Sequence, residues 1–171
     1  MSNPPHDGDG DTLGSDELWS LLASALEPRA PAPQLRQSLL AQLRGPQRWA
    51  PFAGEIARTF GLDLEHTRIA LARISDPAAW QPGFWPGSWF SSTPALQQAR
   101  TVIARLPAGT RIESHRHAGR ELTYVLEGEL IENELTRHAA GALLDMPPGS
   151  SHEIAVAAGA ECLVVFSLPI E

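Results

Sequence analysis

Residues 109–128 read GTRIESHRHAGRELTYVLEG, and this stretch guides the interpretation of the rest of the sequence. Its two histidines, His115 and His117, are two residues apart, and on a β-strand this spacing places both imidazoles on the same face. Glu121 follows after a short break, where a turn at Ala118 and Gly119 can fold the next strand back and bring the carboxylate beside the rings. Two imidazoles and a carboxylate that converge inside a β-structure suit a divalent metal ion that still needs a fourth ligand.

A fourth ligand follows in residues 141–152, GALLDMPPGSSH. This segment reads as a strand, a Pro-Pro-Gly turn and then His152, which opens the next apolar strand. The predicted metal ligands are therefore His115, His117, Glu121 and His152. We expect Zn in the protein as isolated, because Zn binds such sites strongly and is available, with Fe, Ni or Mn as alternatives.

The two segments together resemble the two motifs of the cupin superfamily. The first motif, G-x5-H-x-H-x3-E-x6-G, is complete, and the second, G-x5-P-x-G-x2-H-x3-N, departs only at its last position, where Val156 replaces Asn. The matching positions are Gly109, His115, His117, Glu121, Gly128, Gly141, Pro147, Gly149 and His152. The resemblance implies a mainly β fold, the cupin double-stranded β-helix or jelly-roll barrel, preceded by short N-terminal α-helices. It also implies that the four predicted ligands form the cupin metal site.

Composition limits the classes of partner and compartment. The chain has 171 residues, a net charge of −7 and a pI near 5.3, which argues against direct binding to nucleic acid or to anionic membranes. Its single cysteine, Cys162, excludes an intramolecular disulfide and a Cys-rich zinc site. The apolar residues 163–166 around it favour a buried packing role over a role as an oxidation target. Because the sequence contains neither a membrane-length apolar run nor a signal-peptide pattern, we expect a cytoplasmic protein.

The chain divides into three parts by composition. Residues 1–14 are mostly Pro, Gly and Asp and are expected to form a disordered tail, in which His6 is a solvated side chain. Residues 15–78 are expected to form a helical N-terminal region. Residues 79–171 are expected to form the cupin β-barrel domain.

The helical region carries start and stop signals for four short helices. The signals are Ser15 and Pro33 at two starts, Gly45 and Pro46 at a stop, Trp49 and Gly61 around a third helix, and Asp63 at the start of a fourth. His66, on the first turn of the fourth helix, is expected to be exposed. Helices this short do not stabilise themselves, so they must dock on the barrel, on a second subunit or on another protein.

Residues 80–90, WQPGFWPGSWF, concentrate three Trp and two Phe between Pro and Gly. The favoured interpretation is a hydrophobic strap over the mouth of the barrel or at a subunit interface. The alternative is an aromatic platform on which a ligand stacks.

The strand that follows Glu121 predicts a further apolar surface. If Glu121 points into the barrel, the two-residue period of a strand also points Thr123 and Val125 inward. By the same alternation, Leu122, Tyr124 and Leu126 then face outward. This outward row needs a cover, which the N-terminal helices or a homodimer partner can provide.

Several segments resemble the ChrR-like group of cupins. They are WAPF at 49–52, DPAAW at 76–80, HRHAGRE at 115–121 and VLEG at 125–128, and residues 26–36, LEPRAPAPQLR, resemble the linker after the sigma-binding helices of anti-sigma factors. The resemblance implies a regulator that holds a sigma factor inactive through its helical part and senses reactive oxygen with a metal-binding cupin. No Cys precedes Cys162, so the N-terminal zinc motif of that group, H-x3-C-x2-C, is absent from this sequence.

Two functions from different classes follow. The first is a non-enzymatic, metal-binding regulator of the anti-sigma type that senses an oxidant or a small-molecule ligand. The second is a small metal-dependent cupin enzyme, specifically a dioxygenase, because Fe(II) bound by three His and one Glu leaves positions open for O2 and substrate. The sequence contains no recognisable general base outside the metal ligands, so no catalytic residue is assigned and the sensor is favoured.

Overall fold

The computed structural model describes residues 15–25, 30 and 32–168. The tail predicted for residues 1–14, with His6, lies outside the described residues. The chain divides into two units, residues 1–38 and 39–171, and each is described by itself.

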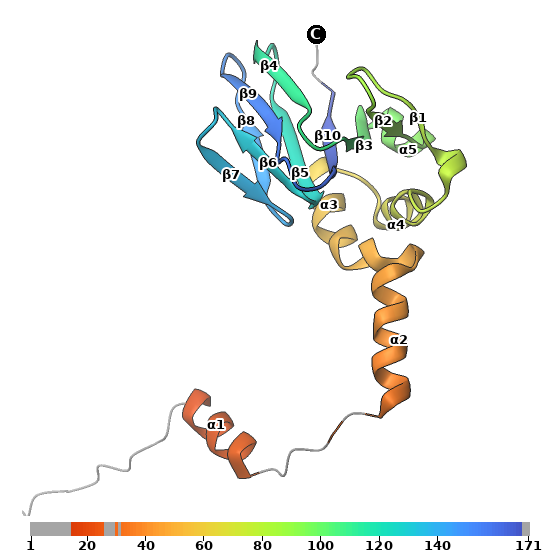
Figure 1. Ribbon diagram of the computed structural model, residues 1–171, viewed down its shortest axis with the longest axis vertical. Coiled ribbons are helices and arrows are strands. Elements are labelled where there is room, and N and C mark those ends of the chain that lie inside the picture. Colours follow the sequence, from red (N-terminus) through yellow and green to blue (C-terminus); the bar gives the residue numbers. More distant parts are fainter. Residues whose placement is uncertain (1–14, 26–29, 31, 169–171) are drawn as a thin grey trace, which may run out of the picture. The chain divides into compact units, whose positions relative to one another are not determined.

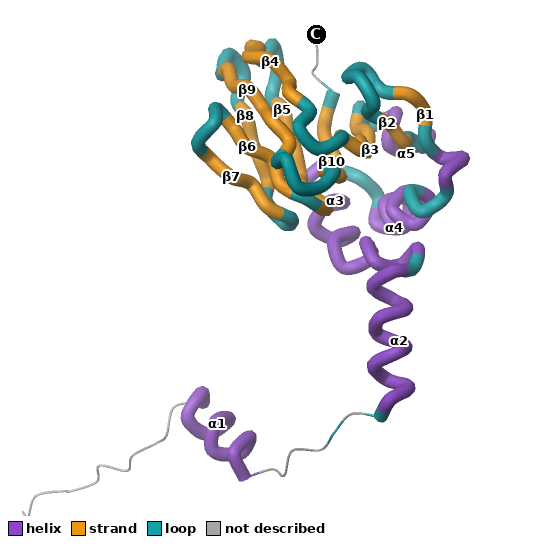
Figure 2. The backbone as a smooth tube through the Cα atoms, viewed as in Figure 1, coloured by secondary structure: helices purple, strands orange, loops and turns teal. Residues whose placement is uncertain are grey.

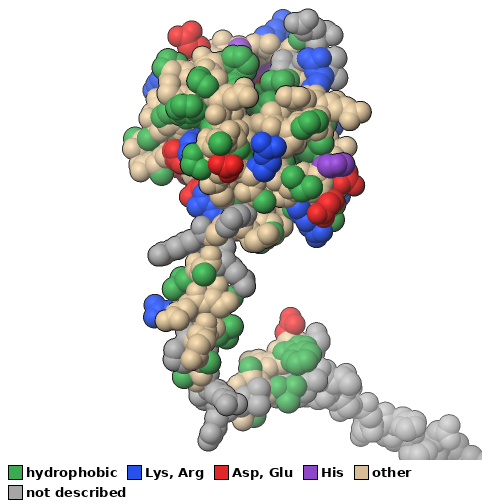
Figure 3. Space-filling model, turned by 90° about the vertical axis from the view of Figure 1, so that its right-hand side faces the viewer, with side chains coloured by type: hydrophobic (Ala, Val, Ile, Leu, Met, Phe, Trp, Pro, Cys, Tyr) green, Lys and Arg blue, Asp and Glu red, His purple; other side chains and the backbone are tan. Residues whose placement is uncertain are grey.

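Two helices come first, at the positions that the sequence signals predicted. They are α1 (Ser15–Ala25) and α2 (Pro33–Arg44). Pro33 opens α2, where its fixed φ suits the first helical position and its missing N–H is not needed. Both helices present large apolar side chains to the surface, and hydrophobic side chains are visible along them in Figure 3. The exposed ones are Trp19, Leu22, Leu35, Leu39 and Leu40.

The next three helices belong to the unit that contains the strands. They are the 3-10 helix η1 (Pro46–Phe52), α3 (Ala53–Phe60) and α4 (Leu64–Arg73). The single helix predicted for residues 49–60 is thus divided, because Pro51 has no N–H to continue α-helical pairing. Gly61 ends α3 in the left-handed region, with a φ of 65°. Asp63 caps α4 by accepting hydrogen bonds from the backbone N–H groups of Glu65 and His66, and His66 is exposed, as predicted.

The strands form two antiparallel sheets that face each other (Figures 1 and 2). One has the order β1 (Gln81–Pro82), β2 (Trp89–Ser91), β3 (Thr101–Leu106), β10 (Cys162–Ser167), β5 (Glu121–Glu127) and β8 (Leu143–Met146). The other has the order β4 (Arg111–Arg116), β9 (Ser151–Val156), β6 (Glu129–Glu132) and β7 (Thr136–Ala139). Two short helices, η2 (Pro77–Ala79) and α5 (Pro94–Gln98), lie between α4 and β3 in the chain. The expectation of a mainly β cupin fold preceded by helices is confirmed.

The central strands of the larger sheet are buried on both faces. Successive residues of β10 alternate between two apolar clusters, since Val164 belongs to the cluster between the sheets while Leu163 and Val165 belong to a cluster with the helices. In β5, Val125 faces the cluster between the sheets, and Tyr124 faces the helical cluster. The larger sheet is therefore the middle layer of three.

Helical residues cover the outward row of β5. Ile56 of α3 and Leu71 of α4 are almost fully buried in the same cluster as Tyr124 and Leu126. The Tyr124 hydroxyl also donates a hydrogen bond of 2.8 Å to Glu55 Oε2 of α3. Of the two covers that the sequence left open, the structure provides the helices for Tyr124 and Leu126.

Candidate metal centre

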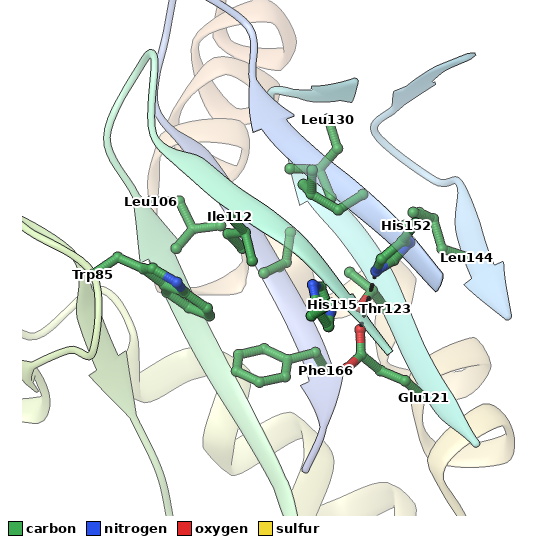
Figure 4. A pocket seen from close by; sticks show the side chains of 12 residues that line it. Trp85, Leu106, Ile112, His115, Glu121, Thr123, Leu130, Leu144, His152 and Phe166 are labelled. Carbon is green, nitrogen blue, oxygen red and sulfur yellow. Dashed lines mark ion pairs between the residues drawn. The ribbon is translucent and has the colours of Figure 1, made fainter. Parts of the chain in front are cut away.

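Neighbouring strands bring the four predicted ligands to one place. His115 lies on β4 directly opposite His152 on β9, and Glu121 opens β5. His117 follows the end of β4. One donor atom from each of the four residues lies within 4.8 Å of the other three, and Figure 4 shows His115, Glu121 and His152 converging.

The turn of the second motif holds the backbone of His117 in position. The N–H of His117 donates to the carbonyl of Ser150 at 3.0 Å, and the N–H of Gly149 donates to the carbonyl of His117 at 2.8 Å. Gly149 has a φ of 83°, in the left-handed region that favours glycine. These two hydrogen bonds join His117, which follows β4, to the turn that precedes β9. The Pro-x-Gly turn of the second motif thereby fixes the backbone of His117 near the strands that carry His115 and His152.

The three imidazoles are nearly equidistant. Their ring centroids are 4.7, 4.8 and 4.9 Å apart in the three pairs. Nδ1 of His115 lies 2.9 Å from the carbonyl oxygen of Glu113, and Nδ1 of His152 lies 3.2 Å from Oε1 of Glu132. Because a carbonyl and a carboxylate only accept, each Nδ1 carries the proton and each Nε2 is left with its lone pair.

Two of these rings have a buried nitrogen that lacks a partner. His117 and His152 are 4% and 3% exposed, and among the described residues nothing hydrogen-bonds to the Nε2 atom of either. Leaving a buried polar atom unpaired costs about 1–3 kcal/mol. Donors about 2.1 Å from a tetrahedral metal ion lie roughly 3.4 Å apart, so a pair of donors at the 4.8 Å limit has to approach by about 1.4 Å. The residues fit a divalent cation, which would satisfy both nitrogens.

Electrostatics favour the protonation state that a metal requires. Burial lowers the pKa of His117 below its usual value, against the opposing effect of the Glu121 carboxylate, whose Oε2 lies 3.4 Å from Nδ1. The neighbouring His152 and His115 rings lower the pKa of His117 further. The ring is thus neutral at physiological pH, and neutral imidazole is the form that binds metal.

The sequence did not predict the roles of Glu132 and His138, which lie outside the set of four proposed ligands and are linked to it through His152. Glu132 of β6 accepts from His152 through one carboxylate oxygen, and its other oxygen lies 3.0 Å from Nε2 of His138 on β7. The strand period was the signal that could have found Glu132, because it lies two residues after the buried Leu130 and so shares its face. His138 could not be linked to the centre without the pairing of β6 with β7.

A small apolar cavity adjoins three of the four proposed ligands, His115, Glu121 and His152 (Figure 4). It measures about 70 Å³. That volume holds roughly five water molecules or a ligand of a few heavy atoms. Among the described residues, Thr123 is the polar side chain that lines it besides His115, Glu121 and His152. The apolar lining consists of Trp85, Leu106, Ile112, Leu130, Leu144, Ile154, Val164 and Phe166.

The aromatic segment at residues 80–90 closes part of this cavity. Trp85 lines the cavity and packs edge-on against Phe90, with ring centroids 5.9 Å apart. Phe90 in turn contacts Phe166 at 5.9 Å. Phe84 leans on Phe90 at 4.8 Å, but its own side chain is largely exposed. The segment is therefore a strap over the cavity, and Trp85 also offers one ring to whatever enters.

The remaining sequence candidates lie away from the centre. Cys162 is fully buried in the cluster between the sheets, as its apolar neighbours predicted. Within the described ranges, no helix combines the length and apolarity needed to cross a bilayer.

Comparison with solved structures finds matches at low identity. One match is a chain in the crystal structure of Rhodobacter sphaeroides SigE in complex with the anti-sigma ChrR. It is 22% identical to this protein, the match covers 88% of this chain and 74% of that chain, and the TM-score is 0.48. A cupin-like protein of unknown function from Ralstonia eutropha is 24% identical over 41% of this chain, with a TM-score of 0.39, and the match spans 46% of its length. An acetylacetone dioxygenase from Acinetobacter johnsonii is 16% identical over 53% of this chain and 68% of that chain, with a TM-score of 0.44.

Comparison with models of protein families gives one match, which covers the part of the chain that forms the strands. No curated protein matches the sequence. The model of the ChrR cupin-like domain matches residues 74–171, which include both cupin motifs and every strand of the two sheets. The chain belongs to the ChrR cupin-like domain family.

Proposed function

We propose that this protein is a metal-binding regulator of the anti-sigma type, in which His115, His117, Glu121 and His152 hold one divalent cation. The observation that carries the metal is the pair of buried, unpartnered Nε2 atoms beside a carboxylate. Zn is the ion proposed for the protein as isolated, with Fe, Ni or Mn as alternatives. When bound there, such an ion would supply a Lewis acid.

Elemental analysis of protein purified without chelator tests the metal. Wild type is expected to carry about one ion per chain, and His117→Ala below about a tenth, because the substitution removes a donor from the middle of the set. His66→Ala is the matched control, since His66 is exposed on α4 and lies outside the cluster. Wild-type protein with less than about a tenth of an ion per chain would contradict the proposal.

The shape of the cavity favours sensing over catalysis. Its apolar lining, with no Lys or Arg among the described residues that form it, selects a small, neutral molecule with an atom that can bind a metal. Apart from the proposed ligands, none of the described residues that line it is titratable. Thr123 can donate or accept one hydrogen bond to orient such a molecule.

A sigma factor is the proposed partner of the helices. Family membership and the exposed apolar side chains of α1 and α2 support this assignment. We expect a sigma factor encoded beside this gene to co-elute with the protein after co-expression. Leu35→Asp with Leu39→Asp on α2 should abolish co-elution, while Gln37→Glu, also exposed on α2, should not. A wild-type protein that elutes apart from the sigma factor would contradict the assignment.

The second candidate is a small Fe(II)-dependent dioxygenase. The observation in its favour is the cavity itself, which places an apolar chamber directly against the His115 and His152 imidazoles and the Glu121 carboxylate. Oxygen uptake by the Fe(II)-loaded protein, with acetylacetone as the probe, distinguishes the two functions. Uptake that depends on the probe and is lost in His117→Ala would favour the enzyme.

Three further assignments complete the proposal. We retain the division into a helical region, residues 15–78, and a barrel domain, residues 79–171. We also propose a cytoplasmic protein and a homodimer. Light scattering at micromolar concentration tests the dimer, and the mass of a single chain would contradict it.

A further inference from the structure

We propose that Glu132 is a positioning residue that holds His152 in the orientation and tautomer required for metal binding, and that His138 holds Glu132 in turn. This inference rests on the proposed metal site. One carboxylate oxygen of Glu132 lies 3.2 Å from Nδ1 of His152, and the other lies 3.0 Å from Nε2 of His138. The carboxylate therefore bridges two imidazoles from two different strands.

The pairing of β6 with its two neighbours places this bridge. Glu132 ends β6, which pairs with β9 on one side and with β7 on the other. Leu130, two residues earlier on the same face, is buried in the wall of the cavity, and His138 lies directly opposite Leu130 across the β6–β7 pair. The side chains of Glu132 and His138 are only 17% and 18% exposed, so the bridge is largely shielded from solvent.

A carboxylate in this position has a defined effect on His152. The ring has one N–H in its neutral form, and a carboxylate that accepts from Nδ1 keeps that proton there. Nε2 then carries its lone pair, and it lies 3.9 Å from Oε1 of Glu121, on the side of the other predicted ligands. Without Glu132, the ring is free to take the other tautomer, in which Nε2 is protonated and cannot bind a cation.

The bridge is poorly explained as a contribution to stability alone. A carboxylate taken out of water loses hydration that its new contacts only partly return, and apolar replacements of buried ion pairs are often as stable. Leu130, on the same face of the same strand, shows that this wall accepts an apolar side chain. The contact of Glu132 with His152 is one that metal-binding histidines usually make, in which the ring nitrogen that does not bind the metal donates to a carboxylate.

Zinc affinity, measured by competition with a chromophoric chelator, tests the inference. Glu132→Ala is expected to raise the Kd for Zn about 10- to 100-fold, the usual effect of losing such a partner. Glu132→Gln keeps an oxygen that can accept from His152, so it should restore most of the affinity. His138→Ala should have a smaller effect than Glu132→Ala, because it acts on His152 only through Glu132.

Glu129→Ala is the matched control. Glu129 lies on the same strand and forms an ion pair with Arg137 of β7, but it does not reach the centre. Its removal should leave the Kd for Zn unchanged. The visible spectrum of the Co(II)-loaded protein gives a second readout, which should change in Glu132→Ala and match wild type in Glu129→Ala.

The outcomes separate this inference from the metal proposal. If wild type binds Zn but Glu132→Ala has the same Kd and the same Co(II) spectrum, only the role of Glu132 is wrong. Equal losses in Glu132→Ala and Glu129→Ala would also overturn it, since the effect would then be a general one on the sheet. If Glu132→Ala does not fold, the Kd values of Glu132→Gln and His138→Ala for Zn decide. A His138→Ala variant with the same Kd as wild type would then overturn the inference. If wild type binds no Zn, both proposals fail.

Discussion

At the scale of single residues, burial decides how Cys162 behaves. The thiol is fully enclosed in the cluster between the sheets. Burial, with a smaller effect of the nearby Glu127 carboxylate, raises its pKa to about 12. Because the thiolate is the reactive form, the native protein holds almost none of it at neutral pH.

We therefore predict that Cys162 does not react in the folded protein. Alkylation by iodoacetamide at pH 8 should be at least about 100-fold slower in native protein than in protein unfolded in urea. Mass spectrometry of timed samples measures the two rates. Rapid stoichiometric labelling of the native chain would contradict the prediction and would restore Cys162 as a candidate for oxidation.

Gly128 shows why a motif position can be read from sequence at this scale. It has a φ of 83°, and an added Cβ would lie 2.5 Å from the carbonyl oxygen of Glu161. Both the conformation and the close approach exclude other residues. Glu132 carries no comparable signal of its own, because a glutamate in a strand is usually solvated.

At the scale of elements, β5 connects the proposed metal site with the helical layer. Glu121 opens the strand, Thr123 lines the cavity, and Tyr124 points the other way into the helical cluster. Burial raises the pKa of Tyr124 to about 12, and its hydrogen bond to Glu55 acts in the same direction. The folded state therefore holds the phenolic proton more tightly than the unfolded chain, whose tyrosine titrates near pH 10.

The sign of the resulting pH dependence follows from linkage. The contribution of Tyr124 to stability is complete below pH ~10 and is lost as the pH rises from about 10 towards about 12. Tyr124→Phe should be less stable by about 1 kcal/mol at pH 8, because the hydrogen bond to Glu55 is gone. It should also lose less stability than wild type above pH 10.

Urea unfolding of both proteins between pH 8 and pH 11 measures this difference. The gap between the two midpoints should narrow as the pH rises. Parallel curves over the whole range would mean that Tyr124 titrates equally in the folded and unfolded states, and the pKa shift would be wrong.

At the scale of the whole molecule, the larger sheet has the smaller sheet and the proposed metal site on one side and helices on the other. Tyr124 and Leu126 share one cluster with Ile56 of α3 and Leu71 of α4. A metal that binds only the native fold stabilises whatever folds with it. The helices should therefore respond to the metal although they contribute no ligand.

We predict that metal removal speeds hydrogen exchange in α3 and α4 as well as in β4, β5 and β9. Exchange followed by mass spectrometry over residues 53–73, with and without chelator, measures the coupling. His117→Ala is the control, because chelator should not change a variant that binds no metal. Unchanged exchange in both helices of wild type would remove the coupling as a mechanism of signalling, since coupling between two sites must be reciprocal.

The sequence by itself determined what depends on local spacing. The i and i+2 histidines follow the period of a strand, the Pro-x-Gly turn follows backbone sterics, and Asp63 and Gly61 bound their helices through interactions within a few residues. The mainly β fold followed from these motifs. The division of residues 49–60 at Pro51 also has a local cause, but the sequence prediction ran a single helix through the proline.

Only the tertiary structure decided what depends on strand register and on packing between distant segments. The pairing of β6 with β7 and β9 brings Glu132 between His138 and His152, which are 14 residues apart in the chain. The sequence left undecided whether helices or a second subunit cover Tyr124 and Leu126, since either would bury the same apolar area. In the structure, residues of the helices cover them. Hydrophobic burial is not directional, so the apolar pattern of a strand predicts that one face is covered without identifying the covering segment. The folded structure identifies that segment.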